Sequence, residues 1–391
     1  MTDFLMLPTM IFCLSLTGLA PALPGQSQLD QPGATQLQQN PTATNHDAAQ
    51  LTVKTVAGNG IDGFSNDGGL AVNAAVSQPF GVVIGPDKSL YVCQVGSHVI
   101  RRIDLASGRI STVAGNGKMG LSSVGELATE SALNEPYEVR FSSTSEMYFV
   151  QMKNHVISKV DRTTGRLVRI AGTAEQGFSG DEGLAIDATF NRPHSIALDS
   201  EDNVFVCDIG NHRIRKIDSK TGLISTFCGT GSKQPIPSSA HISGTALMGP
   251  RALDIDSAGD LILALREGNA IYRIQIQQNR IQHLAGTGKK GFSGDSSLAT
   301  AGQLAGPKGV AVATTGDIYF ADTENHVVRL IRKATGTLHT VVGDGTPGDG
   351  PDGPARKCRL NRPHSVCLDE AGNLYIGDSN NHRVRVLLAA P

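Results

Sequence analysis

The chain has 391 residues, of which 39% are hydrophobic, 18% charged and 5% aromatic, and it contains no Trp. Glycine accounts for 45 of these residues, well above the average of about 7%, which indicates many tight turns between short strands and an all-β protein. The formal net charge is −2 without a long basic block, and this argues against nucleic acid as a partner, because such binding needs a concentrated basic surface.

The first fifty residues differ from the rest. An apolar run from Phe4 to Ala20 precedes the small-x-small site Ala20-Pro21-Ala22, which predicts a secretory signal peptide over residues 1–22. No Lys or Arg precedes the run, which leaves an uncleaved anchor or a misassigned start codon as alternatives. Residues 23–50 are polar and rich in Gln and Pro, and are predicted to be a disordered linker. Past the first thirty residues no apolar run reaches the roughly 18 residues of a membrane span, so none is expected in the mature chain.

The cysteines do not indicate a disulfide framework. Cys13 lies in the predicted signal peptide, and the others are an odd number without a Cys-x-x-Cys pair: Cys93, Cys207, Cys228, Cys358 and Cys367. Free cysteine is among the most buried residue types. These five are therefore predicted to be small apolar fillers.

The decisive feature is a repeat of 57 residues that begins after residue 50. Its glycine marker is Gly58, Gly115, Gly172, Gly229, Gly286 and Gly343. Its proline marker is Pro79, Pro136, Pro193, Pro250 and Pro307, followed one residue early by Pro363. A third marker is His98, His155, His212, Asn269, His326 and His382. Each copy leads from a glycine-rich loop through the Pro into four short strands, such as 194–198, 204–207, 213–217 and 223–227.

Four short strands joined by hairpin turns make one antiparallel sheet. Such a sheet buries too little alone and exposes an edge, so the six copies are predicted to be the blades of a six-bladed β-propeller. The chain enters the pattern at residues 51–57, which match a fourth strand, and leaves it after residues 383–388, which match a third strand. The N-terminal strand is therefore predicted to complete the last blade, which makes residues 51–391 one domain.

The Asn-His step before the third strand, as in Asn211-His212-Arg213-Ile214, resembles the signature of NHL-repeat propellers. The phrase at residues 177–181, echoed at 291–295, is similar to a loop of bacterial NHL proteins and of the teneurin NHL domain. The resemblance covers residues 51–391 and implies the propeller fold. It leaves the activity open, since such propellers serve as ligand platforms, protein-interaction modules and occasionally lyases or lactonases.

Two polar positions of the repeat are interpreted as structural. The repeated His is expected to hydrogen-bond to the backbone and to fix a turn. The glycine-rich loops contribute one carboxylate each, from Asp67, Asp181 and Asp295, whereas calcium takes six to eight oxygen ligands. These Asp residues are therefore interpreted as turn residues.

Function is expected where the copies differ. The first strand of each blade lines the channel of a propeller, and its start lies beside the end of the second strand. The residues after the marker Pro are Phe80, Tyr137, His194, Arg251, Lys308 and His364, and Glu138 follows Tyr137. The second strands end at Gln94, Gln151, Asp208, Leu265, Asp322 and Asp378. This polar ring predicts a ligand site, with the alternative that these groups only satisfy one another in a wet channel mouth.

Three pairs are expected within single blades: His194 with Asp208, His364 with Asp378, and Lys308 with Asp322. An Asp beside a His fixes its tautomer and raises its basicity, so the two His–Asp pairs are candidate catalytic residues. The candidate ligand-binding residues are Tyr137, Glu138, Arg251, Lys308 and Asp322. Arg251 and Lys308 lie on neighbouring blades and are suited to an anionic group such as a carboxylate.

The Pro-His steps at 193–194 and 363–364 are similar to those of peptidylglycine amidating lyase, a six-bladed propeller. That resemblance implies zinc held by histidines on alternate blades. Here His194 and His364 fall on opposite blades, and Glu138 is the one further candidate for the three or four ligands that zinc needs. A calcium-dependent sugar lactonase is a second possibility, drawing its carboxylates from Asp208, Asp322, Asp378 and Glu138. Neither metal is assigned, and no cofactor is predicted.

The leading hypothesis is a secreted or periplasmic propeller that binds a small molecule or a protein partner at its channel face. The alternative is a hydrolase or lyase, lactonase-like or amidating-lyase-like, in which His194 or His364 serves as acid or base. The fourth copy departs most from the repeat, with Leu265 and Asn269 at otherwise polar and His positions. This departure marks either an interaction edge or sequence drift.

Overall fold

The computed structural model describes residues 51–123 and 125–389. The predicted signal peptide (1–22) and linker (23–50) lie outside these residues. Within them, the helices are single 3-10 turns, and none is long and apolar enough to cross a bilayer.

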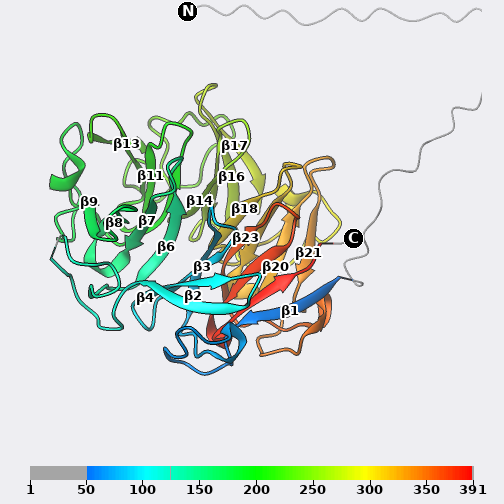
Figure 1. Cartoon of the computed structure of the whole chain (residues 1–391). Helices are drawn as coiled ribbons and strands as arrows, with labels where there is room; N and C mark the ends of the chain where they lie inside the picture. The colour runs from blue at the N-terminus through cyan, green and yellow to red at the C-terminus, as the bar shows by residue number, and fades with distance from the viewer. Residues whose placement is uncertain (1–50, 124, 390–391) are drawn as a thin grey trace, which may run out of the picture. The chain divides into compact units, whose positions relative to one another are not determined.

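Six antiparallel sheets make up this part of the chain, and each provides one blade (Figure 1). Blade 1 contains β2 (Pro79–Ile84), β3 (Leu90–Gln94), β4 (Val99–Asp104) and β5 (Arg109–Ala114). Blade 2 contains β6 (Pro136–Phe141), β7 (Met147–Gln151), β8 (Val156–Val160) and β9 (Leu167–Ala171). Blade 3 contains β10 (Pro193–Leu198), β11 (Val204–Asp208), β12 (Arg213–Ile217) and β13 (Ile224–Cys228). Blade 4 contains β14 (Pro250–Ile255), β15 (Leu261–Leu265), β16 (Ala270–Gln275) and β17 (Arg280–Ala285).

Blade 5 contains β18 (Gly309–Val312), β19 (Ile318–Asp322), β20 (Val327–Ile331) and β21 (Leu338–Val342). The last blade begins with β23 (Pro363–Leu368), β24 (Leu374–Asp378) and β25 (Arg383–Leu387). The first strands contact one another in the order β2, β6, β10, β14, β18 and β23, and β23 contacts β2 again. The predicted six-bladed propeller is therefore confirmed, with the first strand of every blade facing the channel.

The first strand of the chain closes the ring, as predicted. Strand β1 (Thr52–Ala57) pairs antiparallel with β25 and supplies the fourth strand of blade 6 (Figure 1). In this register Val53 lies opposite Leu387 and Thr55 lies opposite Arg385. A two-residue strand, β22 (Gly353–Pro354), covers the outer edge of β1. The fourth strand of the last blade thus comes from the opposite end of the described chain.

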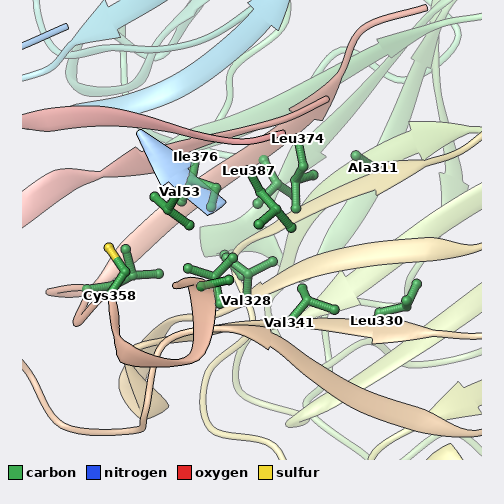
Figure 2. Packing of buried hydrophobic residues seen from close by; sticks show 14 residues of the cluster. Val53, Ala311, Val328, Leu330, Val341, Cys358, Leu374, Ile376 and Leu387 are labelled. Atoms are coloured by element: carbon green, nitrogen blue, oxygen red, sulfur yellow. The ribbon is translucent and has the colours of Figure 1, made fainter. Parts of the chain in front are cut away.

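The core lies between neighbouring blades, where the apolar faces of two sheets meet. Figure 2 shows one such cluster, in which Val53 of β1 packs with Leu387, Ile376 and Leu374 of blade 6 and with Val328 of blade 5. These five side chains are at most 5% exposed. Burying an aliphatic side chain of this size stabilises the fold by about 1.5–3 kcal/mol. Packing as well as backbone hydrogen bonding therefore holds the closing strand in place.

The cysteines fill the core as predicted. Cys93, Cys207, Cys228, Cys358 and Cys367 are buried and free of disulfides, and each belongs to an apolar cluster.

A buried arginine from the third strand joins the sheet to the glycine-rich loop in four blades. These residues are Arg101, Arg215, Arg329 and Arg385, each at most 2% exposed. The first three bind the carboxylates of Asp67 (2.7 Å), Asp181 (2.6 Å) and Asp295 (2.7 Å), and Arg385 binds Asp349 and Asp352. In three blades the guanidinium also lies over a loop ring, Phe64, Phe178 or Phe292. The loop Asp residues interpreted as turn residues are thus ion-pair partners of buried arginines.

The repeated His joins neighbouring blades. Its residue adopts the left-handed conformation, and its Nδ1 accepts a hydrogen bond from the backbone N–H that precedes the marker Pro of the next blade. The acceptor and donor residues are His98 and Glu135 (3.2 Å), His155 and Arg192 (3.0 Å), His326 and Arg362 (3.2 Å), and His382 and Gln78 (3.3 Å). In blade 4 the Oδ1 of Asn269 accepts in the same way from Gly306 at 2.9 Å. The predicted bond to backbone is confirmed for four of the five repeated histidines and spans two blades, whereas Nδ1 of His212 has no hydrogen-bond partner.

This bond requires an unprotonated Nδ1, so it is sensitive to acid. Burial lowers the pKa of His155 below its ordinary value near 6.5. The folded state therefore favours the neutral ring, and this contribution is present above about pH 6.5 and lost as the pH falls below it.

We expect His155→Asn to keep the hydrogen bond, as Asn269 does in blade 4, and to remove its pH dependence. Urea unfolding at about pH 7.5 and 5.5 should show wild type losing stability relative to the variant at the lower pH. His155→Gly, which keeps the backbone conformation without an acceptor, should lose about 1 kcal/mol at the higher pH. A difference between wild type and His155→Asn that is the same at both pH values would contradict this role.

Candidate functional site

Six side chains form one contacting group at the channel mouth, and we refer to them as the channel-mouth group. They are Phe80 (β2), Tyr137 (β6), His194 (β10), Arg251 (β14), Lys308, which precedes β18, and His364 (β23). All except the half-buried Phe80 are at most 7% exposed. The side chains at the position after the marker Pro therefore converge from all six blades.

Aromatic contacts connect one side of this group. The Phe80 ring stacks on His364 with centroids 3.8 Å apart and meets Tyr137 edge-on at 5.0 Å. Tyr137 lies 4.4 Å from His194. The Arg251 guanidinium lies 4.5 Å over the Tyr137 ring and donates a hydrogen bond of 2.8 Å to its hydroxyl. Arg251 thus reaches from blade 4 to blade 2.

Both histidines are held in one tautomer. Nδ1 of His194 lies 2.6 Å from the carbonyl of Arg192, and Nδ1 of His364 lies 2.8 Å from the carbonyl of Arg362. A carbonyl only accepts, so Nδ1 carries the proton and Nε2 is the basic atom. Burial lowers the pKa of both rings well below the usual value, with the positive charge of Arg251 adding to the effect. Both are therefore neutral at physiological pH.

Lys308 is the most perturbed cation of the group. Burial and the nearby Arg251 lower its pKa to about 7, although the carboxylate of Glu324 opposes this shift. Its Nζ lies 3.0 Å from Glu324 and 3.3 Å from Nε2 of His364. Arg362 binds the same Glu324 oxygen at 2.8 Å. An ammonium whose pKa lies this close to neutral pH gains or loses its proton readily when its surroundings change.

The three Asp residues do not pair with the channel-mouth group, which corrects the expected geometry. Their acceptor bonds fall into the same pattern in three blades. One oxygen accepts a loop N–H from Asn191, Ala305 or Asn361, and the other accepts the side-chain amide of Asn211, Asn325 or Asn381. Among the described residues, neither His194 nor His364 is hydrogen-bonded to Asp208 or Asp378.

These carboxylates also lie beside the buried arginines. Asp208 is 3.7 Å from Arg215, Asp322 is 3.6 Å from Arg329 and Asp378 is 3.2 Å from Arg385. Burial raises the pKa of the three to about 6, 7 and 6, respectively. The geometry gives Asp208, Asp322 and Asp378 a structural task, which is to hold the glycine-rich loop on its sheet.

Glu138 lies below the channel mouth and is also engaged. It is 7% exposed and forms an ion pair with Arg140 of its own strand. Burial raises the pKa of Glu138, and the charge of Arg140 opposes that shift. Its carboxylate is therefore balanced within the protein.

The donor set does not fit the zinc or calcium centres considered from the sequence. Within the described ranges, no three His, Cys, Asp or Glu side chains gather in a metal-binding cluster. The Nε2 of His364 faces the amino group of Lys308, and Glu138 faces Arg140.

The electrostatics of the site favour negative charge. Arg251 and Lys308 belong to the group itself, and the positive charges of Arg192, Arg266 and Arg362 also lower the pKa of a group histidine. Glu135 and Glu324 are the acids that act on its members. The guanidinium of Arg251 and the amine of Lys308 can donate hydrogen bonds to a carboxylate or phosphate at this buried mouth.

Sequence reasoning missed Glu324 and Arg362. Glu324 lies in the 3-10 turn η6 (Thr323–Asn325), two residues after the second strand of blade 5 ends at Asp322. Arg362 precedes the marker Pro and has a left-handed backbone. The sequence signal that could have identified these two residues is that both positions vary among the repeats.

Comparison with known protein families agrees with this architecture. The NHL repeat model matches residues 360–387, and the teneurin NHL domain model matches residues 100–218. NHL repeat-containing protein 2 of Bos taurus is 24% identical over 329 residues, which cover 74% of this chain and 45% of that protein. The chain spans less than half the length of the curated relatives it matches first. In the part of the chain that the structure describes, the fold is a six-bladed β-propeller, and its sequence is similar to NHL-repeat proteins.

Solved structures support the fold. An auxiliary nutrient binding protein from Bacteroides thetaiotaomicron has a TM-score of 0.63 at 16% identity, covering 87% of this chain and 76% of that one. A structure described as streptogramin B lyase has a TM-score of 0.53 at 15% identity, covering 88% and 99%. At these identities the likeness concerns the fold alone.

The buried ammonium of Lys308 should cost stability, and this cost should depend on pH. Its folded-state pKa of about 7 lies below the ordinary value of about 10.4, so the unfolded chain binds more protons between the two values. The destabilisation by the buried ammonium is therefore greatest below about pH 7 and disappears as the pH rises toward 10.

We expect Lys308→Met to be more stable than wild type at pH 6.5, with a free energy of unfolding that is larger by about 1–4 kcal/mol. The gain should shrink at about pH 9.5, as measured by urea unfolding. A variant that is less stable than wild type at the lower pH, or a gain that does not change with pH, would refute this assignment.

Proposed function

We propose that this protein is a binding platform whose channel face receives an anionic group carried by a small molecule or a protein. The observation that carries the proposal is the pair of buried cations, Arg251 and Lys308, in one contacting group with two neutral histidines. The nutrient-binding description of the Bacteroides neighbour is consistent with a propeller used for binding.

The group also defines what should accompany the anion. Phe80 and Tyr137 provide apolar ring surface next to the cations. An anion placed beside Lys308 favours its charged form, so binding should take up a proton near pH 7, where this amine titrates. The expected ligand combines a carboxylate or phosphate with a flat or apolar portion.

We also propose that the protein acts outside the cytoplasm, in the periplasm or after secretion. The support is the apolar run and small-x-small site of residues 1–22. Mass spectrometry of the N-terminus after expression in the native host tests this: a mature chain that begins near residue 23 supports it, and an intact Met1 refutes it.

Thermal unfolding with paired compounds tests the binding proposal. We expect benzoate and glucuronate to raise the melting temperature in a dose-dependent way, whereas benzamide and glucose should not at the same ionic strength. The effect should disappear in Arg251→Met, because the removed guanidinium supplies the fixed charge. Equal responses to charged and neutral compounds, or an unchanged response in Arg251→Met, would refute the proposal.

A second candidate function is a hydrolase or lyase that uses the same site. The specific observation is the pinned tautomer of His194 and His364, which makes Nε2 the basic atom of each ring. The Nε2 of His364 also lies 3.3 Å from the Lys308 amine, whose pKa is about 7. The streptogramin B lyase neighbour has the same fold. Turnover of an anionic ester or lactone that is lost in His194→Ala or His364→Ala, with ligand binding retained, would favour the enzyme; binding without turnover favours the platform.

A further inference from the structure

Blade 2 lacks the buried arginine that occupies the same place in four other blades. Ser158 stands at the repeat position of Arg101, Arg215, Arg329 and Arg385. The sequence also has Val124 at the position where other copies have Asp67, Asp181, Asp295 and Asp352. Blade 4 has Tyr272 at the arginine position, and this side chain packs against the core there. Blade 2 has therefore lost both the cation and its carboxylate without gaining a large side chain.

A cavity of about 210 Å³ lies at this place. Leu121, Val156 and Leu167 provide its apolar walls. Leu121 replaces the aromatic ring that lies over the arginine as Phe64, Phe178 or Phe292 in three other blades. The space is the volume that a guanidinium and a phenyl ring fill elsewhere in the molecule.

The polar lining of the cavity offers donors. Gln151 is engaged at both ends, because its Nε2 donates to Ser158 Oγ at 3.0 Å and its Oε1 accepts from Asn154 at 2.9 Å. The Ser158 hydroxyl accepts the first of these bonds and keeps its own proton to donate. A ligand here therefore meets a hydroxyl that is free to donate.

Arg169 adds a positive charge to the same lining. Its Nε is shielded from solvent and has no hydrogen-bond partner, and no described carboxylate lies within 4.0 Å of its guanidinium. The corresponding residues Thr226 and Thr340 donate to the loop carboxylates Asp181 and Asp295. Blade 2 thus has a cation on the sheet, at Arg169, and no carboxylate at the loop position that holds Asp in four other copies.

We propose that this cavity is a second ligand site, and that it binds a small aliphatic carboxylate. The carboxylate would accept from the Arg169 guanidinium and the Ser158 hydroxyl, which are unmatched donors, and the aliphatic part would contact Leu121, Val156 and Leu167. Buried donors that lack acceptors cost free energy, and an anion relieves that cost. The volume is below the roughly 300–1,000 Å³ of drug-sized pockets, so a branched short-chain acid fits the space better than a sugar acid or nucleotide.

The experiment uses isovalerate as the probe and isoamyl alcohol as its uncharged counterpart. Ligand-observed saturation-transfer NMR on the full chain should detect isovalerate binding and no comparable signal from the alcohol. Arg169→Thr, which installs the residue that blades 1, 3 and 5 have at this position, should weaken isovalerate binding about tenfold or more. Ser158→Leu, which fills the cavity, should also abolish it.

Two control variants distinguish binding in this cavity from general charge attraction and from binding at the channel mouth. Arg162→Thr removes the same charge from an exposed position of blade 2 and should bind isovalerate like wild type. The comparison is repeated in an Arg251→Met background, which removes any isovalerate held at the channel mouth, and Arg169→Thr should weaken the remaining binding there by a similar factor. Unchanged binding in both Arg169→Thr and Ser158→Leu, equal binding of the alcohol, or loss of all binding in Arg251→Met alone would overturn the proposal.

Discussion

Ring closure by a strand from the other end of the chain is the constraint on which the rest of the molecule depends. A ring of six sheets fixes where every inner strand lies, so the six residues after the marker prolines meet at one mouth whatever their chemistry. Closure rests on the pairing of β1 with β25 and on the packing of Val53 into the cluster of blades 5 and 6. The channel-mouth group exists because this single junction holds the ends of the ring together.

The repeat separates structural from functional positions. The residues that recur, a His between blades and an Arg between loop and sheet, bind backbone and carboxylate partners inside the protein, although the Nε atoms of Arg101, Arg215 and Arg329 have no hydrogen-bond partner. A buried ion pair is costly to desolvate and most harmful when one partner is lost, and blade 2 lacks both Arg and Asp. The positions that vary, at the channel mouth and in blade 2, are those at which we propose that ligands bind.

The blade number, the strand order and the closing strand could be predicted from the sequence, because a 57-residue period and its phase at the two ends define them. The convergence of the channel-mouth group could also be predicted, since one repeat position maps to one place in the ring. The tasks of Asp208, Asp322 and Asp378 could not, because strand position does not show which loop N–H approaches each carboxylate. Glu324 was missed for a similar reason, as only the 3-10 turn brings it to Lys308.

The buried thiols have a consequence for the redox chemistry of the protein. The thiolate is the reactive form of cysteine, and burial raises the pKa of Cys228 to about 12 and of Cys358 to about 11, and also raises those of Cys93, Cys207 and Cys367. The folded ring therefore resists oxidation and mixed-disulfide formation at these sites even in an oxidising compartment. Since Cys93 lies in β3, Cys207 in β11 and Cys367 in β23, the rate at which each thiol is alkylated reports how often its own blade opens.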